Sequence, residues 1–129
     1  MLKRRVWYQP FCPSILEADA RQAFCDWKGS PNRHMTMAYL VSPDCRERLA
    51  AVINIDGSCR PQIVREDASD DFAALLRAVR SRLGLGAVLN TSFNIHGEPL
   101  VNTPDEAVAV FRESEADALV MGTSLTLRS

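Results

Sequence analysis

The chain lacks a strong excess of either charge and lacks long hydrophobic runs. Both absences reduce the number of function classes to which it could belong. Its 129 residues carry 15 Lys and Arg against 16 Asp and Glu, a formal net charge of -1. Without a global positive field, nucleic-acid or anionic membrane binding is not expected, so any anion site must be local. No apolar run approaches the ~20 residues of a membrane span, and the opening MLKRRVWYQPF lacks the apolar middle of a signal peptide. We therefore expect a cytoplasmic protein that does not bind membranes.

Clustered metal-ligating motifs are also missing. The four cysteines are Cys12, Cys25, Cys45 and Cys59, and they form no CxxC pair and no cluster with His34 or His96. Zinc sites use closely spaced Cys and His ligands, so no metal site is expected. In a cytoplasmic chain, an even cysteine count more often means reduced, partly buried thiols than disulfides. Covalent catalysis is discounted because no Cys and His are placed together by the sequence.

Length and composition indicate one globular domain over residues 1–129. The chain is 47% hydrophobic and 24% charged, and strand-like and helix-like segments alternate along it. Three helices are expected: about 15–25 with Ser14 as N-cap, 72–83 with Gly84 as the stop, and one that begins at the capping box 103–106. Mixed strand pairing with three helices over one sheet describes an open, twisted α/β domain.

Strands are expected at 3–8, 35–41, 51–55, 59–64, from Ala87 onward, 117–121 and 125–127. The pair Asp56-Gly57 is the strongest two-residue hairpin signal in the chain. The strands 51–55 and 59–64 that flank it are therefore expected to pair antiparallel. A turn and a short helical excursion are expected between Ser42 and Leu49.

The segment 87–107, AVLNTSFNIHGEPLVNTPDEA, is the most informative part of the chain. If it is extended, Asn90, Ser92 and Asn94 line one face, because side chains alternate along a strand. Asn amides and a Ser hydroxyl both donate and accept hydrogen bonds, which suits a small planar or anionic ligand. Polar alternation alone is more often a sign of a half-buried strand with a solvated face than of a binding site. The residues by themselves leave both interpretations open.

Four segments, KRRVWYQPFCPSIL, VINIDGSCRPQIV, LNTSFNIHGEPLVNTPDEA and EADALVMG, follow one another across the whole chain. Together they resemble the C-terminal domain of the NodU/CmcH-type O-carbamoyltransferase family. The resemblance implies a YrdC-like fold that binds carbamoyl phosphate and, with ATP as co-substrate, supports formation of a carbamoyl adenylate. It also implies a larger actin/Hsp70-like domain, in cis or in trans, which holds the metal site and transfers the carbamoyl group to a substrate hydroxyl. These 129 residues contain no counterpart of that domain, so the chain is expected to be incomplete as an enzyme on its own.

The resemblance implies three cations around the phosphate. Lys3 and Arg5 match the family's K-x-R element and alternate onto one strand face, where both can approach a phosphate dianion. Taken alone, a basic N-terminus is more often a solvated tail. Arg60 matches the arginine of the family's DGTAR element, and its fork of donors suits a bidentate phosphate contact.

The polar ladder supplies the rest of the implied carbamoyl-phosphate site. Asn90, Ser92 and Asn94 match the family's N-T-S-F-N element. The resemblance implies that Ser92 donates to a phosphate oxygen and that the two asparagines recognise the carbamoyl group. Arg60 and Ser92 are the expected catalytic residues, acting by positioning and electrostatics without a general base. No tightly bound cofactor is expected.

Three departures from the family pattern limit how far the activity carries over. Val6 stands where the family has Glu, Gln9 where it has Arg, and Asn54 where it commonly has His. Asn replaces the hydrogen bond of a His but not its titration. The main hypothesis is therefore a carbamoyl-phosphate-binding domain, and the alternative is a non-catalytic ligand- or partner-binding remnant of the family.

Overall fold

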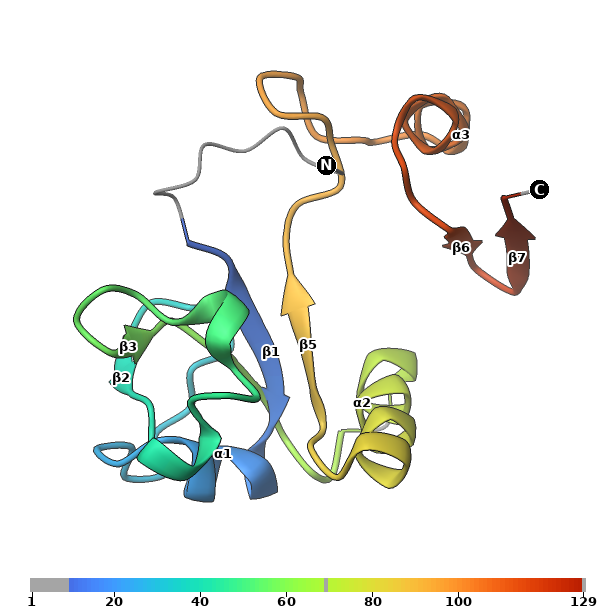
Figure 1. Ribbon diagram of the computed structural model, residues 1–129. Helices are drawn as coiled ribbons and strands as arrows, with labels where there is room; N and C mark the ends of the chain where they lie inside the picture. Colours follow the sequence, from blue (N-terminus) through green and yellow to red (C-terminus); the bar gives the residue numbers. More distant parts are fainter. Residues whose placement is uncertain (1–9, 69, 129) are drawn as a thin grey trace. The chain divides into compact units, whose positions relative to one another are not determined.

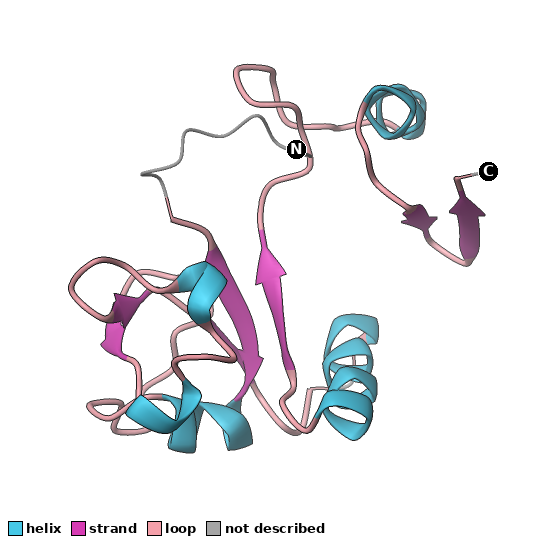
Figure 2. Cartoon of the chain, in the orientation of Figure 1, coloured by secondary structure: helices cyan, strands magenta, loops and turns pink. Residues whose placement is uncertain are grey.

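Figures 1 and 2 show the computed structural model, which describes residues 10–68 and 70–128. The chain divides into two compact units, Pro10–Thr91 and a second whose described part is 92–128. The described residues have the predicted mixed α/β fold with three α-helices. The strand expected at 3–8, and with it Lys3 and Arg5, lies outside the described residues. The single domain over 1–129 and the YrdC-like fold stay predictions.

The Pro10–Thr91 unit is built around a three-stranded sheet of order β4-β1-β5. Its strands are β1 (Cys12–Leu16), β4 (Gln62–Val64) and β5 (Ala87–Asn90). β1 runs parallel to β4 and antiparallel to β5, so the sheet is mixed, and Figure 1 shows β1 and β5 side by side. A separate two-stranded sheet joins β2 (Tyr39–Leu40) to β3 (Ser58–Cys59) in antiparallel orientation.

Apolar side chains fix both faces of the three-stranded sheet. On one face, Ile15 and Ile63 belong to a buried cluster with α1 (Glu17–Ala23) and the β2–β3 pair. On the other face, Leu16 and Val64 pack against Ala73 and Leu76 of α2 (Asp71–Leu83). Directly opposed residues share a face, so the same face continues at the far end of the strands as Cys12, Ser14, Gln62 and Asn90. The site therefore begins where the apolar contact with α2 ends.

The helix predicted from Ser14 is displaced. Ser14 lies in the middle of β1, pairs with both neighbouring strands and is fully buried, so it caps no helix. All five residues of β1 are buried, as in a central strand covered on both faces. The helix α1 begins only at Glu17, because Leu16 still has extended backbone angles.

The predicted hairpin at Asp56-Gly57 is wrong in its pairing, although the turn itself is present. Hydrogen bonds between Asn54 and Ser58 and between Gly57 and Asn54 close the turn at 2.7 and 2.9 Å. The expected strand at 51–55 is absent, since Ala50–Val52 forms a 3-10 turn. The strand after the turn is β3, which pairs with β2. The remainder of the expected 59–64 strand forms a separate strand, β4, which pairs with β1.

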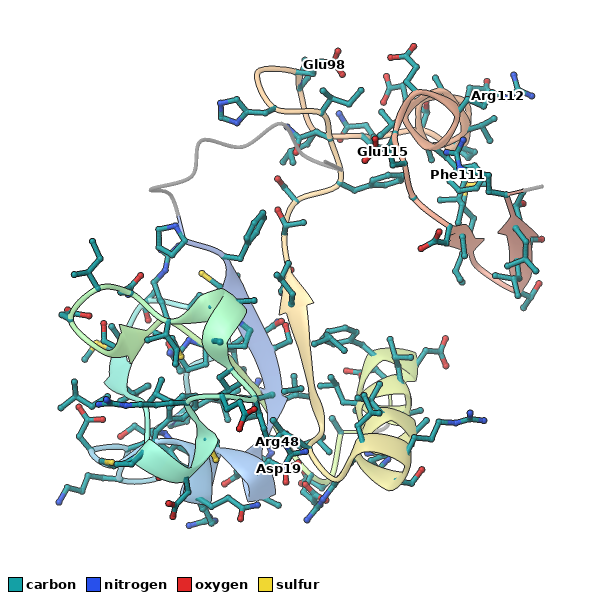
Figure 3. All side chains as sticks on the ribbon, viewed as in Figure 1. Asp19, Arg48, Glu98, Phe111, Arg112 and Glu115 are labelled. Atoms are coloured by element: carbon teal, nitrogen blue, oxygen red, sulfur yellow. The ribbon has the colours of Figure 1, made fainter. Side chains whose placement is uncertain are left out.

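The second unit, over its described residues, holds one helix and one hairpin. The helix α3 (Pro104–Glu113) begins at the predicted capping box, in which Thr103 and Glu106 exchange hydrogen bonds. The strands β6 (Ala118–Met121) and β7 (Ser124–Leu127) form an antiparallel ribbon. Phe111 of α3 packs with Leu119 of the ribbon, and Figure 3 shows Phe111 projecting from the helix toward β6. Within the described part of the chain, no helix combines the length and the apolar character needed to cross a membrane.

Candidate functional site

Three polar side chains, one from each strand of the mixed sheet, meet at its polar end. The Asn90 amide nitrogen donates to Ser14 Oγ at 2.8 Å and to Gln62 Oε1 at 3.0 Å. Ser14 Oγ in turn donates to Gln62 Oε1 at 2.7 Å. We call Ser14, Gln62 and Asn90 the polar triad. Its geometry follows from the register, which sets Ser14 opposite Gln62 on β4.

Arg60 reaches the same end of the sheet. Its Nη2 donates to Cys12 Sγ at 3.4 Å, and Cys12 is the cross-strand partner of Asn90. Among the described residues, Arg60 makes no other side-chain hydrogen bond, and the residue is exposed. A guanidinium with its remaining donors free stands ready for a bidentate contact with an oxyanion. The structure therefore brings together two of the six predicted site residues, Arg60 and Asn90.

Ser92 and Asn94 belong to the second unit and do not extend the strand as predicted. β5 ends at Asn90, and the chain then folds back on itself. Ser92 Oγ donates to Asn94 Oδ1 at 2.6 Å, and Asn94 Nδ2 donates to the Glu98 carbonyl at 2.8 Å. The prediction that the polar ladder lines one face of an extended strand is wrong, because these local hydrogen bonds favour a compact turn over further pairing.

A cavity of about 450 Å³ lies beside Gln62, on the outer side of β4. It is lined by Arg33 and His34, by β4 and by Phe72 at the start of α2. The lining Arg65 is paired with Asp67, whose carboxylate accepts from Arg65 Nε at 2.7 Å. That hydrogen bond holds the pKa of Asp67 below its ordinary value. Arg33 is therefore the lining cation that makes no hydrogen-bonded ion pair among the described residues.

A buried asparagine holds the short connection between β3 and β4 that contains Arg60. Asn32 is 1% exposed, and its Nδ2 donates to the carbonyls of Met37 at 2.9 Å and Pro61 at 2.8 Å. Its Oδ1 accepts from the backbone N–H groups of Thr36 at 3.0 Å and Met37 at 3.3 Å. The side chain thus uses all of its hydrogen-bonding groups to join the 32–37 loop to the residue after Arg60.

Sequence reasoning missed Ser14, Gln62 and Asn32. Ser14 carried the signature of a helix cap, and its true partners lie 48 and 76 positions away. The one available signal for Gln62 was a polar residue at the start of the apolar run Ile63–Val64. Across residues 10–68 and 70–128, no group of three or more His, Cys, Asp or Glu is arranged to hold a metal ion.

All four cysteines are free, as predicted, and three of them are buried. Burial raises the pKa of the Cys59 thiol to about 12, with a further contribution from neighbouring Cys12. The thiolate is the reactive form, so Cys59 is inert at neutral pH.

We expect one thiol to react quickly with a disulfide reagent at pH 8 in the native protein, and the other three only after unfolding. The fast thiol is Cys25, the exposed one. Absorbance of the thiolate released from the reagent measures the number of cysteines that have reacted. Cys25→Ser is expected to abolish the fast phase. A fast phase that persists in Cys25→Ser would contradict the burial described above.

Taken together, the mixed sheet, the polar triad and the adjacent arginine define a small α/β unit with a candidate anion site at one end of its sheet. The profile of the family described as "Carbamoyltransferase C-terminus" matches residues 1–128. The chain belongs to this family, which confirms the predicted relation to the C-terminal domain of NodU/CmcH-type carbamoyltransferases.

Its relatives are much longer proteins. An uncharacterised protein of Methanocaldococcus jannaschii is 37% identical over 127 residues, covering 98% of this chain and 20% of the relative. Nodulation protein NolNO of Sinorhizobium fredii is 35% identical over 127 residues, 97% of this chain and 18% of the relative. The 3'-hydroxymethylcephem-O-carbamoyltransferase of Amycolatopsis lactamdurans is 29% identical over 121 residues, 94% of this chain and 22% of the relative. The chain thus spans about a fifth of their length.

Proposed function

We propose that this chain is the carbamoyl-phosphate-binding domain of an O-carbamoyltransferase and supports formation of a carbamoyl adenylate. The observation that carries the proposal is the convergence of Arg60 and the polar triad at one end of the sheet. Family membership and the carbamoyltransferase among the relatives support the choice of ligand. The proposed setting is cytoplasmic.

In this proposal the two ends of the ligand are held by different chemistry. Arg60, with Lys3, Arg5 and Ser92 as further proposed ligands, binds the phosphate, and Asn90 and Asn94 recognise the carbamoyl group. Water attacks the carbamoyl carbon of carbamoyl phosphate, and phosphate leaves carrying both protons of that water, which yields carbamate. The ionised carbamate oxygen then attacks the α-phosphorus of ATP as pyrophosphate leaves. Because that oxygen is already ionised, positioning and cationic stabilisation suffice, and no general base is required.

The cavity beside Gln62 supports the nucleotide part of the proposal. Its volume of about 450 Å³ suits a drug-sized ligand. Arg33 offers a cation for a phosphate, and the partly exposed Phe72 offers an apolar wall for a base. Transfer to the acceptor hydroxyl is assigned to a larger carbamoyltransferase domain, in cis or in trans, which is also where a metal site is expected.

Partner binding without catalysis is the second candidate function, and the β6–β7 ribbon favours it. Val120, Leu125 and Leu127 are 69%, 62% and 68% exposed. Val120 is directly opposite Leu125, so these side chains share the ribbon face that turns away from Leu119 and α3. An apolar face of this kind is typical of protein contact surfaces. Under this alternative the chain would dock on a partner and bind no carbamoyl phosphate.

Isothermal titration of the full chain with carbamoyl phosphate tests the proposal. We expect saturable binding in the millimolar range or tighter, weakened about 10- to 100-fold in Arg60→Ala because charge-assisted hydrogen bonds are lost. Arg82→Ala is the matched control, since Arg82 is exposed on the last turn of α2 and lines no part of the site. Absence of heat, or equal affinity in Arg60→Ala and Arg82→Ala, would reject carbamoyl-phosphate binding at this site and leave the partner-binding candidate.

A further inference from the structure

We propose that Gln62 and Ser14 fix the Asn90 amide in one orientation, so that the site selects ligands that offer an N–H donor at this position. The inference rests on the proposed function, because it concerns the carbamoyl end of the same site. It adds Gln62 and Ser14 as positioning residues, which act on the ligand only through Asn90.

The protons of the polar triad determine this orientation. The Asn90 amide nitrogen has two N–H groups, and they go to Ser14 Oγ and Gln62 Oε1. Ser14 has a single O–H, which goes to Gln62 Oε1, so its oxygen is the acceptor for Asn90. Turning the Asn90 amide alone would set its oxygen against Gln62 Oε1 and lose a hydrogen bond at a partly buried place. Both donors of Asn90 therefore stay inside the triad as long as Gln62 keeps its Oε1 toward Asn90, as the structure has it.

The remaining group of Asn90 is its carbonyl oxygen, and it is left for the ligand. Within the described part of the chain, no hydrogen bond reaches Oδ1 of Asn90. Ser14 is fully buried, whereas Asn90 is partly exposed, so the triad presents its asparagine outward. The Asn90 carbonyl oxygen can therefore accept a hydrogen bond from an N–H group of a ligand, whereas a methyl group has no hydrogen bond to give it.

This arrangement discriminates between two ligands of nearly equal shape and charge. Carbamoyl phosphate and acetyl phosphate share the acyl phosphate, but one carries an NH2 group where the other carries a methyl. Arg60 contacts Cys12, the neighbour of Asn90, and would hold the phosphate of either ligand equally. We expect carbamoyl phosphate to bind about tenfold more tightly than acetyl phosphate. The difference corresponds to one hydrogen bond, from the ligand NH2 group to the Asn90 carbonyl, that acetyl phosphate cannot make.

Substitutions at Gln62 test the orientation through the ratio of the two affinities. Gln62→Glu can only accept, so the ratio is expected to stay near the wild-type value even though the added negative charge weakens both ligands. Gln62→Lys can only donate, which draws the Asn90 oxygen into the triad and is expected to remove the preference for carbamoyl phosphate. Gln62→Met removes the acceptor and is expected to reduce the ratio severalfold. An unchanged ratio in Gln62→Lys and Gln62→Met would overturn the inference.

A second measurement needs neither a ligand nor a variant. In the 15N spectrum of the wild-type chain, both side-chain amide protons of Asn90 are expected to exchange with water far more slowly than those of Asn102, which is exposed. Exchange at Asn90 as fast as at Asn102 would overturn the inference even if the Gln62 variants fail to fold. If neither acyl phosphate binds while the Asn90 protons are protected, the proposed function fails and the orientation of Asn90 stands.

Discussion

Asn32→Asp is expected to lower the free energy of unfolding by about 2–4 kcal/mol, because the carbonyls of Pro61, which is buried, and Met37, which is partly buried, each lose a hydrogen bond worth about 1–3 kcal/mol when left unsatisfied. The change keeps the size of the side chain and the acceptor used by Thr36 and Met37. It replaces Nδ2 with an oxygen that faces the carbonyls of Met37 and Pro61. Three oxygens then crowd a place from which water is excluded, since Asn32 is almost fully buried.

Urea denaturation followed by circular dichroism measures this effect. Asn102→Asp makes the same chemical change at an exposed position and is expected to stay within about 0.5 kcal/mol of wild type. Because Asn32 also holds the carbonyl of Pro61, the loop that positions Arg60 should loosen in the folded fraction of Asn32→Asp. Equal stability of the two variants would show that the Asn32 hydrogen bonds do not hold this loop.

Asp19→Ala is expected to cost about 3 kcal/mol, because it leaves a buried N–H unpaired and removes a partner of a charged group. Asp19 is 1% exposed, and its Oδ2 accepts from the Gly86 N–H at 2.9 Å. Its Oδ1 lies 3.5 Å from Arg80 Nε. The labelled side chain in Figure 3 lies where α1 approaches the segment between α2 and β5.

The backbone at Gly86 packs tightly against α1 and the end of β1. A Cβ atom at position 86 would lie 2.5 Å from Leu16 Cδ1 and 2.9 Å from Asp19 Oδ2, so the backbone is held close to both side chains. Thermal unfolding of Asp19→Ala beside Asp44→Ala, an exposed acid, provides the comparison. If both variants melt with the wild type, the Asp19 contact does not anchor the start of β5.

Local signals in the sequence were sufficient for two of the three helices. Asp70 accepts from the Ala73 N–H as the N-cap of α2, and Gly84 ends that helix with φ of 71°, a left-handed conformation that favours glycine. The capping box at Thr103 sets the start of α3. These contacts join residues three or four positions apart, so the chain's own sequence specifies them.

Strand pairing was less predictable, because register depends on residues far apart in the chain. Ser14 had the local character of a helix cap, but three-stranded pairing and complete burial placed it in β1. The turn at Asp56-Gly57 formed, while its flanking strands found other partners. Non-local pairing overrode local preference in both places.

The candidate site shows the same division. Arg60 and Asn90 were identified from motifs and lie at one end of the sheet, but the triad that holds Asn90 came only from the register of β1, β4 and β5. The alternation expected beyond Asn90 failed because Ser92, Asn94 and the Glu98 carbonyl bond to one another in a turn. Sequence motifs thus named candidate contacts for the proposed ligand, and the structure supplied the two residues that hold Asn90.

The central claim is that carbamoyl phosphate binds at the polar end of the β4-β1-β5 sheet, and chemical-shift mapping tests it most directly. In 15N spectra of the full chain titrated with carbamoyl phosphate, we expect the largest changes at Cys12, Arg60, Gln62 and Asn90, with saturation at a common affinity. Exposed residues of α2 such as Arg82 should stay unshifted. No saturable shifts, or shifts confined to residues away from this end of the sheet, would contradict the account.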